Sequence, residues 1–319
     1  MALYIAEIVT IVRHKKFHNS FYALFIMRAI PDLLNVFNSF YGQRLPSIIG
    51  AALYPIYSKF PNWMLAMFFF FGGHTFEANY LVTAFISLNR LTAIIMPIKH
   101  EKLWRKFFPF ITIFVYFVST LLCWPAFKMN AIIRLKDPNS TTDHSFIVYE
   151  AGDAPIINYL ACACAVFSVI FMIICVLLNI CTFVAYKLHM KKVSINRNNN
   201  LDDLKKKLLF YALATFLGHA LIASLFLINI ITKVDDWKTT FMIFVYYPLI
   251  LDTVLASWLL LWASSTFRQQ LIKDFSIIRI RNIRVGPMEG PQNNNHRAVE
   301  GAVGHQLQNR ICRQLPAIS

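Results

Sequence analysis

Hydrophobic positions along this chain lie in long uninterrupted blocks, whereas a helix on the surface of a soluble protein shows them as a stripe on one face. Six blocks approach or exceed the roughly 20 apolar residues that a helix needs to cross a bilayer. They are residues 20–41, 63–88, 107–127, 156–186, 208–232 and 239–263. Because backbone groups in lipid must be hydrogen-bonded within their own segment, we expect all six to be helices.

A seventh, shorter block opens the chain. Residues 1–12 are apolar apart from Glu7, and the run ends at the basic residues Arg13 to Lys16. At 1.5 Å per residue this block reaches only about 18 Å, too little to cross. No basic region precedes it, so it does not resemble a signal peptide. We therefore expect an all-α, polytopic fold, a bundle of seven transmembrane helices whose first helix is truncated.

Composition favours a membrane protein over a soluble one. Hydrophobic residues make up 57% of the chain, charged residues only 15%, and the mean hydropathy is +0.51. A soluble domain needs far more charge on its surface. The net charge of +15 is compatible with a nucleic-acid binder, but the basic residues lie in short clusters between hydrophobic blocks. Such clusters are typical of cytoplasmic loops, so the expected partner is the lipid bilayer and not nucleic acid.

The distribution of basic residues predicts the orientation. With seven helices, 23 of the 31 Lys and Arg residues fall on one side of the membrane. That side contains the C-terminal tail, and we assign it to the cytoplasm of a plasma-membrane protein whose N-terminus is outside. The one Asn-x-Ser/Thr sequon, at Asn139, falls in a loop predicted to be outside, where it would accept a glycan.

The predicted bundle domain covers residues 1–275. Thr266 and Gln269 have capping-box spacing, and Phe267, Leu271 and Phe275 fall on one face, which predicts a short helix along the inner leaflet. Residues 276–319 are predicted to be a disordered cytoplasmic tail, because their later part lacks an apolar pattern. The six cysteines form no CxxC pair, so neither a disulfide framework nor a metal site is expected, and no cofactor is implied.

The end of the predicted third helix carries a family resemblance. Asn89-Arg90, Pro97 and Trp104 resemble the (N/H)R…P…W pattern of nematode serpentine chemoreceptors, in the superfamily that contains classes gamma and V. Residues 17–22 and 44–46 resemble the same families, and we favour class V. The resemblance covers roughly residues 1–275. It implies a G-protein-coupled receptor whose partners are a heterotrimeric G protein and a small-molecule ligand, with no enzymatic activity.

The resemblance also implies roles for single residues. In rhodopsin-like receptors an arginine at this helix end meets the G protein, so Asn89, Arg90 and Pro97 are the candidate coupling residues. Asn89 stands where those receptors have an acid, so a salt bridge to the neighbouring residue is not expected. No cysteine lies at the outer end of the third helix or in residues 128–155, so the usual extracellular disulfide is not expected either.

Ionisable groups inside membrane helices are costly, and each is a functional candidate. Arg28 and Asp32 are one helical turn apart, and two interpretations stay open. The two side chains simply neutralise each other, or Asp32 anchors an inter-helix polar network in which Asp252 of the seventh helix takes part.

His74 and Glu77 are three residues apart, so they share a face in the outer half of the third helix. They are candidates to line a ligand pocket with His219 opposite. The alternative is a buried hydrogen-bonded pair. A metal site made of the same three residues depends on an assumed helix arrangement and is not expected.

The receptor interpretation has three rivals. A transporter or channel typically shows internal repeats and broken helices, and no repeat links the two halves of this chain. The second rival is an intramembrane enzyme. The third is a truncated orphan membrane protein that does not signal. We favour a receptor in which an extracellular ligand biases an equilibrium between two helix packings and opens the cytoplasmic face near Arg90.

Overall fold

The computed structural model describes residues 2–135, 145–153, 155–193 and 255–283, with isolated helical positions between 210 and 228. Three candidate residues, Asn139, His219 and Asp252, lie outside the described residues. The chain divides into two units, Met1–Phe275 and Ser276–Ser319. In the second unit the described residues are 276–283, which are helical. The predicted tail beyond them also lies outside the described residues.

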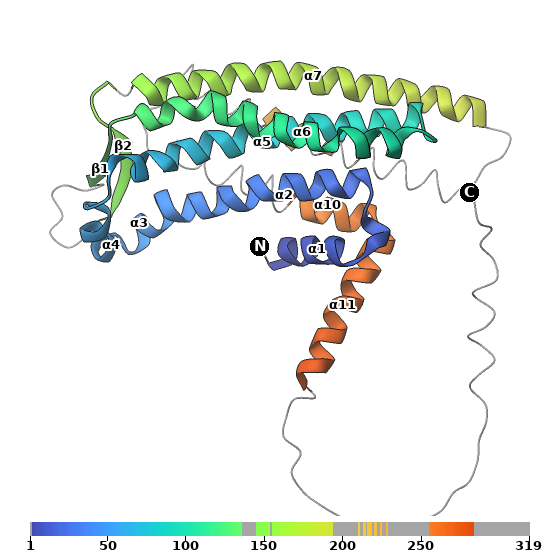
Figure 1. Cartoon of the computed structure of the whole chain (residues 1–319), viewed down its shortest axis with the longest axis horizontal. Coiled ribbons are helices and arrows are strands. Elements are labelled where there is room, and N and C mark those ends of the chain that lie inside the picture. The colour runs from blue at the N-terminus through green and yellow to red at the C-terminus, as the bar shows by residue number, and fades with distance from the viewer. Residues whose placement is uncertain are drawn as a thin grey trace, which may run out of the picture. The chain divides into compact units, whose positions relative to one another are not determined.

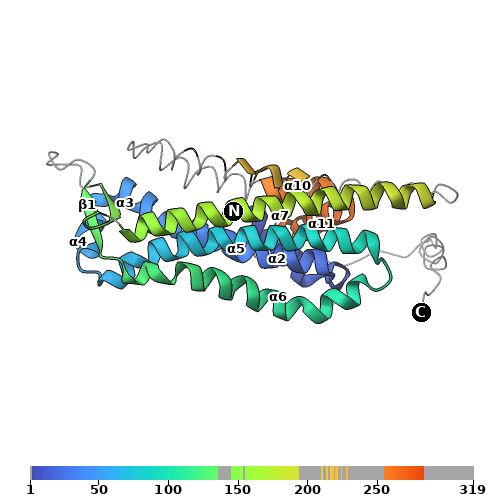
Figure 2. The same cartoon turned by 90° about the horizontal axis from the view of Figure 1, so that it is seen from above.

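Four long helices form the body of the first unit: α2 (Ser20–Ser39), α5 (Asn62–Ile95), α6 (His100–Cys123) and α7 (Pro155–Val193). They lie side by side in two perpendicular views (Figures 1 and 2). α2 continues through a π-helical turn, η2 (Phe40–Arg44), into α3 (Leu45–Ile48), and α6 continues into the 3₁₀ turn η3 (Trp124–Lys128).

Four stretches of the described residues are long and apolar enough to cross a membrane: Ser20–Ile48, Asn62–Ile95, His100–Lys128 and Pro155–Leu188. They contain the first four predicted spans. Most of the fifth predicted span lies outside the described residues, and the last is seen only in α10 (Leu255–Ala263).

Three shorter elements pack against α2: α1 (Ala2–Arg13), η1 (Lys15–Phe17) and the start of α11 (Ser265–Ile283). A fourth, α4 (Gly50–Tyr57), follows α3 and contacts it. α1 contacts both α2 and α10.

The start of α11 corrects one expectation. The hydroxyl of Ser264 accepts the backbone N–H of Phe267 at 3.3 Å, so the cap lies two residues before the predicted capping box at Thr266. Phe267 and Leu271 are buried on one face, whereas Phe275 is 49% exposed.

A small β-hairpin departs from the all-α expectation. β1 (Ala131–Leu135) pairs antiparallel with β2 (Phe146–Glu150), and Ala131 stands opposite Glu150. Its buried residues form a second core with Tyr57 and Met129, separate from the core between the long helices. The hairpin lies beside α4, at the end of the bundle where α7 begins (Figure 1).

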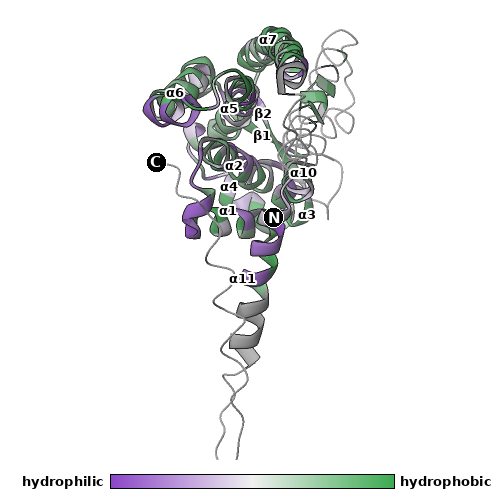
Figure 3. Cartoon of the chain, turned by 90° about the vertical axis from the view of Figure 1, so that its right-hand side faces the viewer, coloured by the Kyte–Doolittle hydropathy of each residue, from purple (hydrophilic) through white to green (hydrophobic). Residues whose placement is uncertain are grey.

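α5 is the central helix, because it contacts α2, α6 and α7. The outer faces of α6 and α7 carry exposed apolar side chains, among them Phe110, Ile113 and Phe117 on α6 and Ile173 and Leu177 on α7. In the end-on view the ribbon of α7 is mostly green, the colour of hydrophobic residues (Figure 3). Apolar surface of this extent on a soluble protein would cause aggregation, whereas it suits contact with lipid tails.

Candidate functional site

A polar cluster ties the end of α5 to the starts of α2 and α6. The side-chain amide of Asn89 donates to the hydroxyl of Ser20 at 2.9 Å. Ser20 in turn donates twice to the carboxylate of Glu101, from its hydroxyl at 2.9 Å and from its backbone N–H at 3.0 Å. Ser20 begins α2 and Glu101 lies in the first turn of α6. These three bonds therefore join three helices at one point.

His100 and Trp104 connect α6 to α5 within the same cluster. His100 Nδ1 lies 3.1 Å from the hydroxyl of Thr92, and its Nε2 lies 3.2 Å from the hydroxyl of Ser20. The indole N–H of Trp104 donates to the hydroxyl of Thr92 at 2.8 Å. The tryptophan of the recognised sequence pattern thus has a specific partner on α5. Pro97 is exposed in the turn between α5 and α6.

Arg90 is covered by α2 in this structure. Its side chain is only 8% exposed, and the guanidinium carbon lies 3.9 Å from the centroid of the Phe21 ring. A cation placed over an aromatic face is attracted by the ring electrons. Phe21 follows Ser20 directly in α2, so the same turn of that helix holds both Asn89 and Arg90.

A second set of polar contacts joins α11 to the segment around η1. The carboxylate of Asp274 lies 2.9 Å from His14 Nε2, and the ammonium of Lys16 donates to the amide oxygen of Gln270 at 2.7 Å. Burial by itself raises the pKa of Asp274, but hydrogen bonds from His14 and Gln270 outweigh it and lower that pKa. α11 is thereby held against the basic segment that precedes α2.

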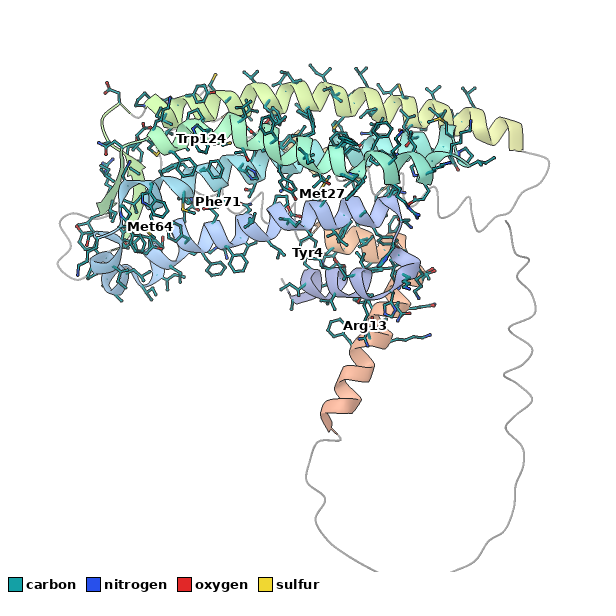
Figure 4. The ribbon with its side chains drawn as sticks, viewed as in Figure 1. Tyr4, Arg13, Met27, Met64, Phe71 and Trp124 are labelled. Atoms are coloured by element: carbon teal, nitrogen blue, oxygen red, sulfur yellow. The ribbon has the colours of Figure 1, made fainter. Side chains whose placement is uncertain are left out.

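A buried network surrounds Asp32 further along the bundle. One of its carboxylate oxygens accepts the amide of Asn79 on α5 at 2.8 Å, and the other accepts the hydroxyl of Tyr4 on α1. Arg28 Nε lies 3.8 Å from Asp32, and the side chains of this pair are 0% exposed. Figure 4 labels Tyr4 where α1 faces α2. The structure thus places Arg28 and Asp32 together and adds Tyr4 and Asn79, two residues that sequence reasoning missed.

The two candidate pocket residues of α5 are both buried and both contact α6. The ring of His74 stacks on Tyr116 with centroids 6.1 Å apart and an interplanar angle of 9°. The carboxylate of Glu77 lies 3.6 Å from the thiol of Cys123, the last residue of α6. The two residues therefore share a helix interface.

Sequence reasoning found Asn89, Arg90 and the tryptophan through their spacing, but it missed Ser20, Phe21 and Glu101 as their partners. One signal was present. Glu101 is the single acidic residue in the basic stretch 90–106. Contacts between helix starts that are far apart in the sequence leave no periodic signal.

Comparison with known proteins gives three matches. The sequence model of the Srg family of chemoreceptors matches residues 1–271. Serpentine receptor class gamma-5 of Caenorhabditis elegans is 24% identical over 229 residues, which cover 68% of this chain and 65% of the relative. Serpentine receptor class gamma-2 of the same organism is 26% identical over 133 residues, 41% of this chain and 39% of the relative.

The chain thus spans less than two thirds of the length of these curated relatives. The superfamily resemblance is confirmed, and the preference for class V within it is wrong, because all three matches point to class gamma. The residues that separate the two classes did not stand out in a single sequence.

Proposed function

The chain belongs to the Srg family of chemoreceptors, a family of multi-pass membrane proteins, and from this premise we propose that it is a G-protein-coupled chemosensory receptor. In this proposal a small molecule from outside the cell binds within the helix bundle. The heterotrimeric G protein binds at the end that carries Arg90. The N-terminus is outside and the C-terminal tail is cytoplasmic at the plasma membrane, as the distribution of basic residues favours.

The observation that carries the proposal is the covered position of Arg90. A receptor needs two packings with different affinities for its G protein, and a ligand shifts the population between them. Arg90 lies at the end of α5 beneath the Phe21 ring, and Asn89 beside it is hydrogen-bonded to Ser20. In the proposal, this packing is the one in which Arg90 is withheld from the G protein.

The ligand site belongs to the other half of α5. His74 and Glu77 lie on the same helix as Arg90, and their partners Tyr116 and Cys123 are on α6. A ligand that enters between α5 and α6 there changes the contacts of the helix pair whose opposite end holds Arg90. The network of Asp32, Arg28 and Asn79 lies on α2 and α5 between the two regions.

The test does not require the natural ligand. Phe21→Leu keeps an apolar side chain but removes the aromatic face that attracts the guanidinium. We expect this variant, purified and placed in vesicles with a panel of heterotrimeric G proteins, to show higher basal nucleotide exchange than the wild type. Adding Arg90→Ala to Phe21→Leu should return the exchange to background while leaving surface expression unchanged.

A matched control comes from α7, where Lys187→Ala removes an exposed cation from the far end of that helix. Exchange by the Phe21→Leu variant should survive this change. Exchange that persists in the Phe21→Leu/Arg90→Ala protein would refute the role proposed for Arg90.

A further inference from the structure

An open groove of about 330 Å³ runs between the starts of α2 and α6. At one end it is lined by His18, Asn19 and Arg105, and one to two helical turns further on by Ala23, Ile26 and Phe108. Both helices start at this end, so the groove changes from polar to apolar along their common direction. Phe107 and Phe110 beside it are exposed. The groove therefore follows the polarity of a bilayer from the headgroups towards the hydrocarbon.

The polar end of the groove is positively charged. Arg105 and His18 are exposed, and so are Lys16 and Lys102 near the lining residues. The one acidic residue in the lining is Glu101, and both of its oxygens are occupied by Ser20. Arg105, Lys16 and Lys102 outnumber this single carboxylate, so an anion that enters this end meets a net positive charge.

We infer that this groove binds an anionic phospholipid of the cytoplasmic leaflet, with its phosphate at Arg105 and one acyl chain along Ile26 and Phe108. The side of the membrane follows from the orientation given under the proposed function. Anionic lipids are concentrated in the cytoplasmic leaflet, and basic side chains near that surface attract them.

The same groove touches the cluster that positions Arg90. Ser20, Glu101 and Trp104 line the groove and also make the hydrogen bonds that join α2, α5 and α6. A lipid seated there contacts α2 and α6 together. The lipid headgroup is thus placed to stabilise one arrangement of these helix starts over another.

The test is native mass spectrometry of the delipidated full chain in detergent, titrated with dioleoyl phosphatidylserine and, separately, dioleoyl phosphatidylcholine. The wild type should bind the serine lipid more tightly. Removing one basic residue near an anionic lipid costs about 1 kcal/mol, so Arg105→Gln should weaken this binding about five-fold. Lys187→Gln makes the same change of charge at the same end of the bundle, on α7, and should leave the affinity unaltered.

A third variant tests the groove itself without changing charge. Ala23→Leu places a larger side chain among the lining residues and should weaken binding of the serine lipid. A monodisperse peak on size-exclusion chromatography reports whether the Ala23→Leu variant folds. If it does not fold, the comparison of Arg105→Gln with Lys187→Gln still tests whether the groove binds the lipid.

Three results would overturn the inference: equal binding of the two lipids, equal effects of the arginine and lysine changes, or displacement of the lipid by inorganic phosphate alone. The last result would show a simple anion site. Because binding is measured in detergent without a G protein, it is independent of coupling. If lipid specificity is lost but the Phe21→Leu variant still shows raised exchange, only the lipid site is refuted. If the lipid binds as expected but no exchange is seen, only the proposed function is refuted.

Discussion

Replacing Asp32 with leucine would remove the carboxylate at the centre of the buried network. Asp32 accepts hydrogen bonds from Asn79 and Tyr4, and it lies 3.8 Å from the guanidinium of Arg28. Both members of the ion pair are wholly buried. In the Asp32→Leu protein the arginine keeps its charge without this partner, and the hydroxyl of Tyr4 loses its acceptor.

The expected cost is large. Removing one partner of a buried ion pair costs about 3–5 kcal/mol, because an uncompensated charge stays in the interior. Replacing both partners with apolar side chains of similar size is often close to neutral. The double variant Arg28→Met/Asp32→Leu should therefore recover most of the loss, a coupling on the order of 3 kcal/mol. At about 2–4 °C per kcal/mol for a chain of this size, the single variant should melt roughly 10 °C below the wild type.

Thermal unfolding in detergent can be followed with a maleimide dye. Cys123, Cys164 and Cys175 are free and buried, so they react only when the bundle opens. The two exposed cysteines of the described residues, Cys162 and Cys181, and also Cys312, which lies outside them, are changed to serine in every protein to lower the background. If the double variant melts as low as Asp32→Leu alone, Arg28 is not the charge that Asp32 compensates. Asp32 would then act through its other hydrogen bonds.

Two further predictions concern the ends of the helices. The carboxylate of Glu150 accepts two backbone N–H groups in the first turn of α7, at 2.7 and 3.2 Å. Glu150→Gln removes one acceptor oxygen and the negative charge at the helix start. It should therefore lower the free energy of unfolding by about 1–2 kcal/mol. An unchanged melting temperature in the same dye assay would contradict this. Trp104→Phe removes the donor to Thr92 but keeps an aromatic ring, and it should raise basal nucleotide exchange in vesicles. Exchange equal to that of the wild type would show that this bond does not restrain the receptor.

The long apolar blocks predicted the membrane helices but not their ends. The predicted span 63–88 stops before Ile95, where α5 ends, and the predicted span 107–127 begins after His100, where α6 starts. Charged residues end the apolar block, but they do not end the helix. The first turns of α6 lie beyond that block and are held by the bonds of Glu101 and Trp104.

The hairpin was missed although its strands carry a signal. Residues 131–135 and 146–150 are rich in β-branched and aromatic side chains, as strands are. They lie in a loop between two apolar blocks, and two strands of five residues are short beside the spans. The residue that fixes the start of the hairpin was not predicted either. Asn62 donates to the carbonyl of Met129 at 2.6 Å and accepts the backbone N–H of Ala131 at 2.7 Å. A contact between the start of α5 and a distant loop cannot be inferred from spacing.

The polar cluster also limits how Arg90 could be uncovered in the proposed coupling. Phe21 must move away from Arg90, and Ser20 moves with it. If α2 moves alone, it breaks the bond to Asn89, the contact with His100 and two bonds to the carboxylate of Glu101. Bonds to a charged group are worth about 1.5–3 kcal/mol each and neutral ones about 1 kcal/mol, so this route costs roughly 6 kcal/mol.

If α2 and α6 move as one unit, the carboxylate bonds persist. The broken bonds are then Asn89 to Ser20 and those of His100 and Trp104 to Thr92, which are neutral when the imidazole is neutral. At about 1 kcal/mol each they sum to roughly 3 kcal/mol. The joint movement is therefore the less costly route. For the same reason Trp104→Phe, which removes one of these three bonds, should favour the open state, whereas loss of the carboxylate bonds would favour a movement of α2 alone.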